Sequence, residues 1–123
     1  MSSAQDPRRS RGFEAEGQAA EWLERCGFEV LRRNWKLPRT TVQSATEIDI
    51  LARRGGVAWV VEVKSARCVG HEVTELLSQS QRRRLYQAAL TLSQGRLGRV
   101  RVALLWVHAS AEGTCHFEWL ENP

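Results

Sequence analysis

The sequence has too few cysteines for a disulfide framework and lacks an apolar run long enough to span a membrane. Its three cysteines, Cys26, Cys68 and Cys115, are odd in number and widely spaced, which favours a reducing compartment. Cys68 and His71 have the spacing of half a zinc site, but no second pair completes it. The first residues, MSSAQDPRRSRG, lack the apolar segment of a signal peptide. These absences predict a cytoplasmic protein with no membrane partner.

Lysine is also scarce. Lys36 and Lys64 are the only lysines among 18 basic residues, and the others are arginines. With 14 acidic residues, the net charge is +4. The planar guanidinium of arginine suits phosphate contacts, so this composition is compatible with a nucleic-acid partner. The alternative is a surface made basic by a GC-rich genome, and composition alone favours neither interpretation.

The 123 residues are enough for one domain with one core. Residues 1–12 suggest a flexible basic arm, followed by a single domain over 13–123. Apolar spacing predicts helices over 13–26 and 78–94, each followed by a glycine. Alternating or apolar runs predict strands over 28–35, 47–54, 57–64, 99–107 and 115–121. This order predicts an α/β fold with a mixed central sheet flanked by helices.

One predicted strand carries an unexpected pair of charges. The run VAWVVEVKSA, residues 57–66, is apolar except where Glu62 and Lys64 interrupt it. Charged residues are rarely buried in a strand unless they are paired or bind a metal. The preceding strand contains two further acidic residues, Glu47 and Asp49.

Gly55-Gly56 between these two strands supports a tight hairpin turn. The simplest register places Asp49 opposite Glu62 and Glu47 opposite Lys64. Because side chains alternate along a strand, all four would then project from one face of the sheet.

Opposed carboxylates repel each other unless a cation lies between them. Two carboxylates with waters suit Mg²⁺, and the ammonium of Lys64 beside the ion could hold or activate a water for attack on phosphate. The residues therefore suggest metal-assisted phosphodiester hydrolysis. The alternative is a solvated hairpin face with an ordinary Glu47–Lys64 pair.

Asp49 followed by Glu62-Val63-Lys64 resembles the D…(D/E)-x-K signature of the restriction-endonuclease-like superfamily. Three ordered motifs, AEGQAAEWLERCGFEVLRRNW, EIDILA and WVVEVKSA, more closely resemble the YraN-type family of small predicted bacterial endonucleases. The resemblance implies a restriction-endonuclease-like αβββαβ core. It also implies a Mg²⁺- or Mn²⁺-dependent endonuclease acting on DNA, with branched or damaged DNA among its substrates.

The resemblance also implies roles for individual residues. Asp49 and Glu62 would bind the metal, and Lys64 would be the catalytic lysine. Glu47 matches the acidic residue that begins the E-I-D motif and would bind metal or order Lys64. Glu16 matches a first-helix glutamate that helps complete the metal site in related resolvase-like nucleases. The alternative for Glu16 is a solvated helix carboxylate.

Four residues are candidates for nucleic-acid contacts: Arg53, Gln81, Arg82 and Arg83. Gln81 also has capping-box spacing from Ser78, and arginine runs are often simply solvated. A fold does not dictate activity, so the alternative function is a nucleic-acid-binding module with little or no catalysis. A third possibility is an acidic face that binds a basic partner. The sequence leaves open the choice between DNA and RNA and the oligomeric state, a homodimer included.

Overall fold

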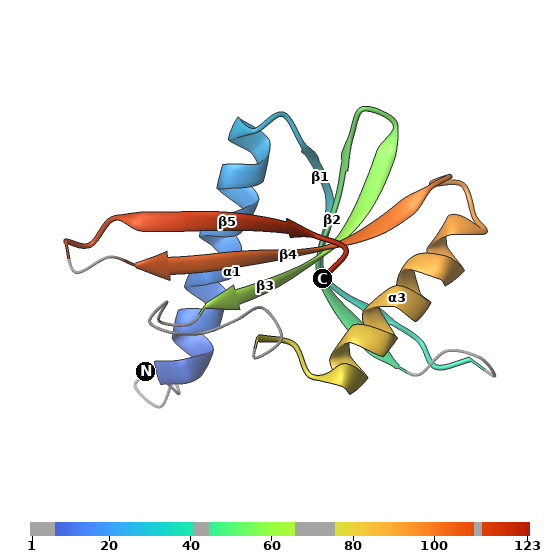
Figure 1. Cartoon of the computed structure of the whole chain (residues 1–123), viewed down its shortest axis with the longest axis horizontal. Coiled ribbons are helices and arrows are strands. Elements are labelled where there is room, and N and C mark those ends of the chain that lie inside the picture. The colour runs from blue at the N-terminus through green and yellow to red at the C-terminus, as the bar shows by residue number, and fades with distance from the viewer. Residues whose placement is uncertain (1–6, 41–44, 66–75, 110–111) are drawn as a thin grey trace, which may run out of the picture.

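The computed structural model describes residues 7–40, 45–65, 76–109 and 112–123. Cys68 and His71 therefore lie outside the described residues, as does the predicted arm up to residue 6. Within these residues, two helices and five strands follow one another (Figure 1): α1 Pro7–Arg25, β1 Glu29–Leu37, β2 Thr46–Arg54, β3 Val57–Ser65, α3 Gln79–Ser93, β4 Val100–Ala109 and β5 Cys115–Glu121. The predicted order of helices and strands is confirmed.

The five strands form one mixed sheet in the order β1-β2-β3-β4-β5. Neighbouring strands are antiparallel except β3 and β4, which are parallel and are joined by the connection containing α3. Two hydrophobic cores lie against the sheet, one under α1 and one under α3. Val61 belongs to the α1 core and its neighbour Val60 to the α3 core. Because adjacent strand residues point to opposite faces, the two helices cover opposite faces of the sheet.

Helix α1 begins at Pro7, so residues 7–12 are helical, whereas the sequence suggested a flexible arm there. Proline is well suited to the first turn of a helix because the backbone there needs no N–H donor. The helix ends at Arg25, and the predicted stop, Gly27, follows with a left-handed φ of 90°. Gly27 N donates to Glu24 O at 3.0 Å and Phe28 N to Leu23 O at 2.9 Å, the hydrogen-bond pair of a Schellman cap.

Helix α3 begins with the predicted capping box. The Ser78 hydroxyl accepts a hydrogen bond from Gln81 N at 3.2 Å, and the Gln81 side chain accepts one from Ser78 N at 3.1 Å. These bonds satisfy two of the free N–H groups at the helix start. Leu85, Ala88 and Ala89 are buried against the sheet, as the apolar spacing predicted. No described helix is long and apolar enough to cross a membrane.

The hairpin between β2 and β3 has the predicted register, from Arg54↔Val57 to Ile50↔Val61. Both turn glycines have positive φ, 60° for Gly55 and 78° for Gly56, as tight hairpin turns require. The ladder ends at Ile50↔Val61, so it does not extend to the expected Asp49–Glu62 and Glu47–Lys64 pairs. Beyond this point β2 remains paired with β1, and β3 remains paired with β4. Figure 1 shows the two pairs of strands diverging.

The ladder between β1 and β2 is interrupted at the level where the sheet divides. It contains Arg33↔Ile50 and Trp35↔Ile48 but skips the residues between them, Asn34 and Asp49. Ile50 packs in the α1 core, whereas Ile48 packs in the α3 core. Residues two apart in a regular strand share a face. The strict alternation from which one common face was predicted therefore fails between Ile48 and Ile50.

Candidate active site

The candidate site lies where β2 and β3 separate. An Asp49 carboxylate oxygen accepts a hydrogen bond from Val63 N at 2.9 Å. A backbone N–H at this position needs a partner once the ladder has ended, and the side chain of Asp49 supplies it. This bond fixes the Asp49 carboxylate against β3, beside Glu62.

Glu62 is half-buried on β3, and its surroundings favour the protonated carboxyl. The pKa of Glu62 is raised to about 9, chiefly by burial and also by a side-chain hydrogen bond to Asp49 and the Asp49 charge. The nearby Lys64 charge acts in the opposite direction and lowers this pKa. Two carboxyl groups that share a half-buried site cannot both ionise without a large repulsion. Asp49 and Glu62 are therefore close enough to share a proton or a cation.

Glu16 brings a third carboxyl group from α1. The pKa of Glu16 is raised to about 7, first by burial and then by the Asp49 charge, a hydrogen bond to Asp49 and the Glu47 charge, while the Arg33 charge acts to lower it. The helix neighbours of Glu16, Ala19 and Ala20, are buried. Their small side chains allow the helix to approach the sheet closely, which places Glu16 at the helix–sheet boundary rather than in open solvent.

This set of groups has the chemistry of a site for a hard divalent cation. Three carboxyl groups from α1, β2 and β3 supply oxygen ligands, and their mutual repulsion would be relieved by positive charge. Within the described ranges, no three acidic, histidine or cysteine side chains are already arranged as a metal-holding group. An ion would have to replace the hydrogen bonds that the Glu16 and Glu62 carboxyl groups make to Asp49. The residues fit Mg²⁺ or Mn²⁺ in donor type and charge.

Lys64 and Glu47 act on different members of this cluster. Lys64 follows Glu62 by two residues on β3, and its charge acts on Glu62. Glu47 is exposed on β2, and its charge acts on Glu16. Both therefore remain near the cluster, although the β2–β3 ladder does not pair them.

Residues 15–107 match the family described as "Uncharacterised protein family UPF0102". The chain belongs to this family. A UPF0102 protein of Paramagnetospirillum magneticum is 40% identical over 88 residues, which cover 72% of this chain and 66% of that relative. One from Beutenbergia cavernae is 33% identical over 115 residues, covering 90% of this chain and 92% of that relative. The chain thus spans just under two thirds of the first relative and most of the second.

The family match confirms the YraN-type resemblance drawn from the sequence motifs. It extends from α1 to β4 and so includes every element that contributes to the acidic cluster. Strand β5 lies beyond the matched residues.

In the UPF0102 chain, two of the candidate nucleic-acid residues, Arg53 and Gln81, already make hydrogen bonds within the protein. Arg53 is half-buried, and its Nη2 donates to Leu97 O at 3.2 Å. Arg53 is four residues from Asp49 on β2, a separation of about 13 Å along the strand. The Gln81 side chain is occupied in the helix cap. Neither residue is therefore placed as a free contact beside the acidic cluster.

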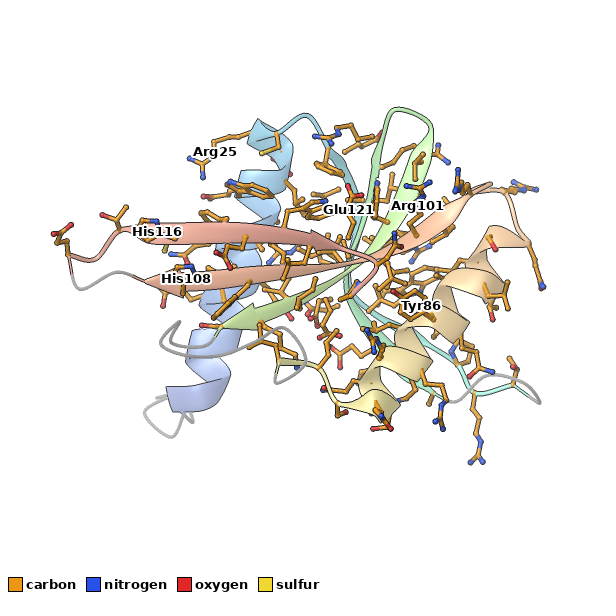
Figure 2. All side chains as sticks on the ribbon, viewed as in Figure 1. Arg25, Tyr86, Arg101, His108, His116 and Glu121 are labelled. Carbon is orange, nitrogen blue, oxygen red and sulfur yellow. The ribbon has the colours of Figure 1, made fainter. Side chains whose placement is uncertain are left out.

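Arg82 and Arg83 differ although they are adjacent on α3. The Nε of Arg82 donates to Pro123 O at 2.8 Å, and the hydroxyl of Tyr86 donates to the same oxygen at 2.9 Å. Figure 2 labels Tyr86 on α3. Arg83 is exposed, and it is the better candidate for a phosphate contact.

Arg33 is a site residue that sequence reasoning missed. It pairs with Ile50, so its side chain lies on the α1 face. Its Nη2 would lie 3.9 Å from a Cβ added to Gly17, and its charge lowers the pKa of Glu16. The irregularity between Val30 and Arg32 shifts the register of β1. Alternation in the sequence alone could therefore not show which face Arg33 occupies.

Proposed function

We propose that this UPF0102 protein is a Mg²⁺- or Mn²⁺-dependent endonuclease that hydrolyses phosphodiester bonds in DNA. The observation that supports this most strongly is the convergence of Glu16, Asp49 and Glu62 where the sheet divides, with Lys64 beside them. A solvated hairpin face would not require three half-buried carboxyl groups with mutual hydrogen bonds. Such a cluster is costly without a cation.

Asp49 and Glu62, with Glu16, would hold the divalent ion. When bound, the ion would supply positive charge that neutralises the carboxylates and polarises a phosphate oxygen. Asp49 is already fixed by the Val63 N–H bond, so one ligand is oriented before an ion arrives. The other two must lose their protons, because their pKa values are raised to about 9 for Glu62 and about 7 for Glu16.

Lys64 would act on the reacting groups rather than as a ligand, because an ammonium has no lone pair to donate. In hydrolysis, a water oxygen forms a bond to phosphorus, the bond to the leaving oxygen breaks, and the water proton passes to a base or solvent. The Lys64 ammonium would orient that water and stabilise negative charge that develops on the phosphate. Glu47 and Arg33 would adjust the charge around Glu16.

The deciding experiment is a cleavage panel over single-stranded, duplex, flapped and four-way DNA, with matched RNA. We expect cleavage in Mg²⁺ or Mn²⁺ and none in chelator. Asp49→Asn should weaken metal binding and reduce cleavage by at least about 100-fold, because it removes a charged ligand. Glu24→Gln removes an exposed carboxylate from the same helix as Glu16 and should behave like the parent.

Each contrary outcome has a definite meaning. Nucleic-acid binding with no metal-dependent cleavage would reject the nuclease and favour a binding module of the same fold. Cleavage that Asp49→Asn leaves unchanged would place hydrolysis elsewhere in the protein. The presence of Asp49, Glu62 and Lys64 together favours the enzyme over the binding module.

Nucleic-acid affinity should fall steeply with salt, because phosphate contacts release counterions from DNA. Arg83→Ala should reduce the slope of log affinity against log salt by about 0.9 if Arg83 makes one duplex phosphate contact. Titrations from about 50 to 200 mM salt would measure this. Arg96→Ala, an exposed arginine beyond the end of α3, is the matched control. An unchanged slope in Arg83→Ala would mean that this arginine is only solvated.

A further inference from the structure

Asn34 has an uncommon backbone conformation inside β1. Its φ is 51°, in the left-handed region. Non-glycine residues rarely occupy this region, and asparagine tolerates it better than most. Asn34 is exposed, so burial of its side chain does not explain why the strand adopts this conformation.

The unusual conformation coincides with the interruption of the β1–β2 ladder. Asn34 and Asp49 are the two residues skipped between Arg33↔Ile50 and Trp35↔Ile48. At this point the side chains of both strands also change from one face of the sheet to the other. Arg33 lies near Gly17 of α1, whereas Trp35 packs against the α3 core.

The interruption determines where the Asp49 carboxylate can reach. In an uninterrupted strand Asp49 would share the face of Leu51, which packs in the α3 core. Glu16 comes from α1, on the opposite face, and nevertheless shares a hydrogen bond with Asp49. The same carboxylate accepts the Val63 N–H from β3. Asp49 can meet both groups because it has left the regular ladder at the point where the sheet divides.

We propose that Asn34 is a positioning residue. Its left-handed conformation maintains the gap in the β1–β2 ladder at Asn34 and Asp49, and thereby directs the Asp49 carboxylate toward Glu16 and Val63. This inference rests on the proposed function in assigning the aimed carboxylate to a metal site. Irregularities of β-ladders commonly redirect side chains beside active sites, and residues in sparsely populated backbone regions concentrate there. Asn34 contributes through its backbone and need not touch substrate.

The test compares Asn34→Gly, Asn34→Ala and Asn34→Val. Glycine adopts the left-handed region freely, alanine less readily, and the β-branched valine least. Asn122 has the same φ of 51° and follows β5, so Asn122→Val imposes the same kind of backbone strain at a second position. It is the matched control.

The first measurement is hydrogen exchange at the Val63 amide, which reports directly on the Asp49 carboxylate. We expect Asn34→Val to accelerate this exchange by about tenfold, equivalent to about 1.4 kcal/mol. The Trp59 and Val61 amides should keep their parent rates, because they point toward β2 like the Val63 amide and lie in the intact part of the hairpin. Asn34→Gly and Asn122→Val should resemble the parent. This arm requires neither metal nor activity.

The second measurement is Mn²⁺ affinity by calorimetry. Asn34→Val should bind about tenfold more weakly, Asn34→Ala should be intermediate, and Asn34→Gly should match the parent. Parent-like Val63 exchange in both Asn34→Val and Asn34→Ala would overturn the inference, as would equal losses in Asn34→Val and Asn122→Val. If Asn34→Val does not fold, the pair Asn34→Ala and Asn34→Gly decides. A parent protein without Mn²⁺ affinity would reject the proposed function, while Val63 exchange would still decide the role of Asn34.

Discussion

Lys64→Ala should reduce metal-dependent DNA cleavage by at least about 100-fold, the usual effect of removing a group that stabilises the transition state. Mn²⁺ affinity should remain close to that of the parent, because Lys64 cannot be a ligand. A large loss of cleavage with little change in Mn²⁺ affinity would distinguish Lys64 from a metal ligand. Loss of a ligand lowers binding and cleavage together, whereas loss of Lys64 lowers the cleavage step alone.

Single-turnover cleavage at saturating Mn²⁺, with calorimetry on the same samples, measures both quantities. Parent and variant are compared at one pH with the protons released on binding counted by calorimetry, because the Lys64 charge lowers the pKa of Glu62 and its removal keeps Glu62 protonated to a higher pH. Arg25→Ala is the matched control, since Arg25 is exposed at the end of α1 and points away from the rest of the chain in Figure 2. A Lys64→Ala variant that cleaves like the parent would exclude this lysine from the chemistry.

Local sequence signals were sufficient for most of the fold. Gly55-Gly56 fixed the hairpin register because both residues adopt positive φ in the turn. The Ser78 capping box and the Gly27 stop depend on hydrogen bonds between residues close in sequence. These features could be predicted because no distant part of the chain is needed to form them.

The candidate site was predictable only in part, because it depends on contacts between distant elements. Alternation brought Asp49 and Glu62 to neighbouring positions, but nothing in the Glu16 helix shows that α1 lies against this end of β2. The motif resemblance supplied that expectation. The arginine run beginning at Arg82 gave no indication that one member would bond to Pro123, 41 residues away.

The interruption at Asn34 and Asp49 had no recognisable sequence signal. A single asparagine in a predicted strand does not specify a left-handed residue, and a change of face on both strands keeps the pairing offset constant. Strict alternation therefore placed Glu47, Asp49, Glu62 and Lys64 on one face. In the structure, the Glu47 charge acts on Glu16, whereas the Lys64 charge acts on Glu62. Sites at ladder irregularities are where alternation is least informative.

Glu62→Gln should make the metal-free protein more stable at alkaline pH and weaken Mn²⁺ binding at every pH. The pKa of Glu62 is raised from 4.5 to about 9. Below about pH 4.5 the folded and unfolded states both carry the Glu62 proton, so the protonated carboxyl costs the folded state no stability. Between that value and about 9 the unfolded chain releases a proton that the folded chain retains, so stability falls as pH rises.

Glutamine cannot ionise and can still donate a hydrogen bond to Asp49, so Glu62→Gln should lose much of this pH dependence. One pKa unit is equivalent to about 1.4 kcal/mol. With about half of the effect removed by solvent screening, the variant should gain about 3 kcal/mol in unfolding free energy over the parent near pH 8.5. The gain should be small near pH 5. Urea unfolding in chelator at both pH values measures it, with the exposed Glu24→Gln as control.

Metal binding by the parent should show the opposite dependence on pH. An ion needs ionised Glu62, so binding must displace a proton wherever the pH is below about 9. Mn²⁺ affinity should therefore rise with pH, by up to about tenfold per unit for each proton released. Glu16 adds to this rise up to about pH 7, the value to which its pKa is raised. Calorimetry in buffers of different ionisation enthalpy counts the released protons directly. Affinity that is independent of pH in the parent and unchanged in Glu62→Gln would show that the ion binds without Glu62.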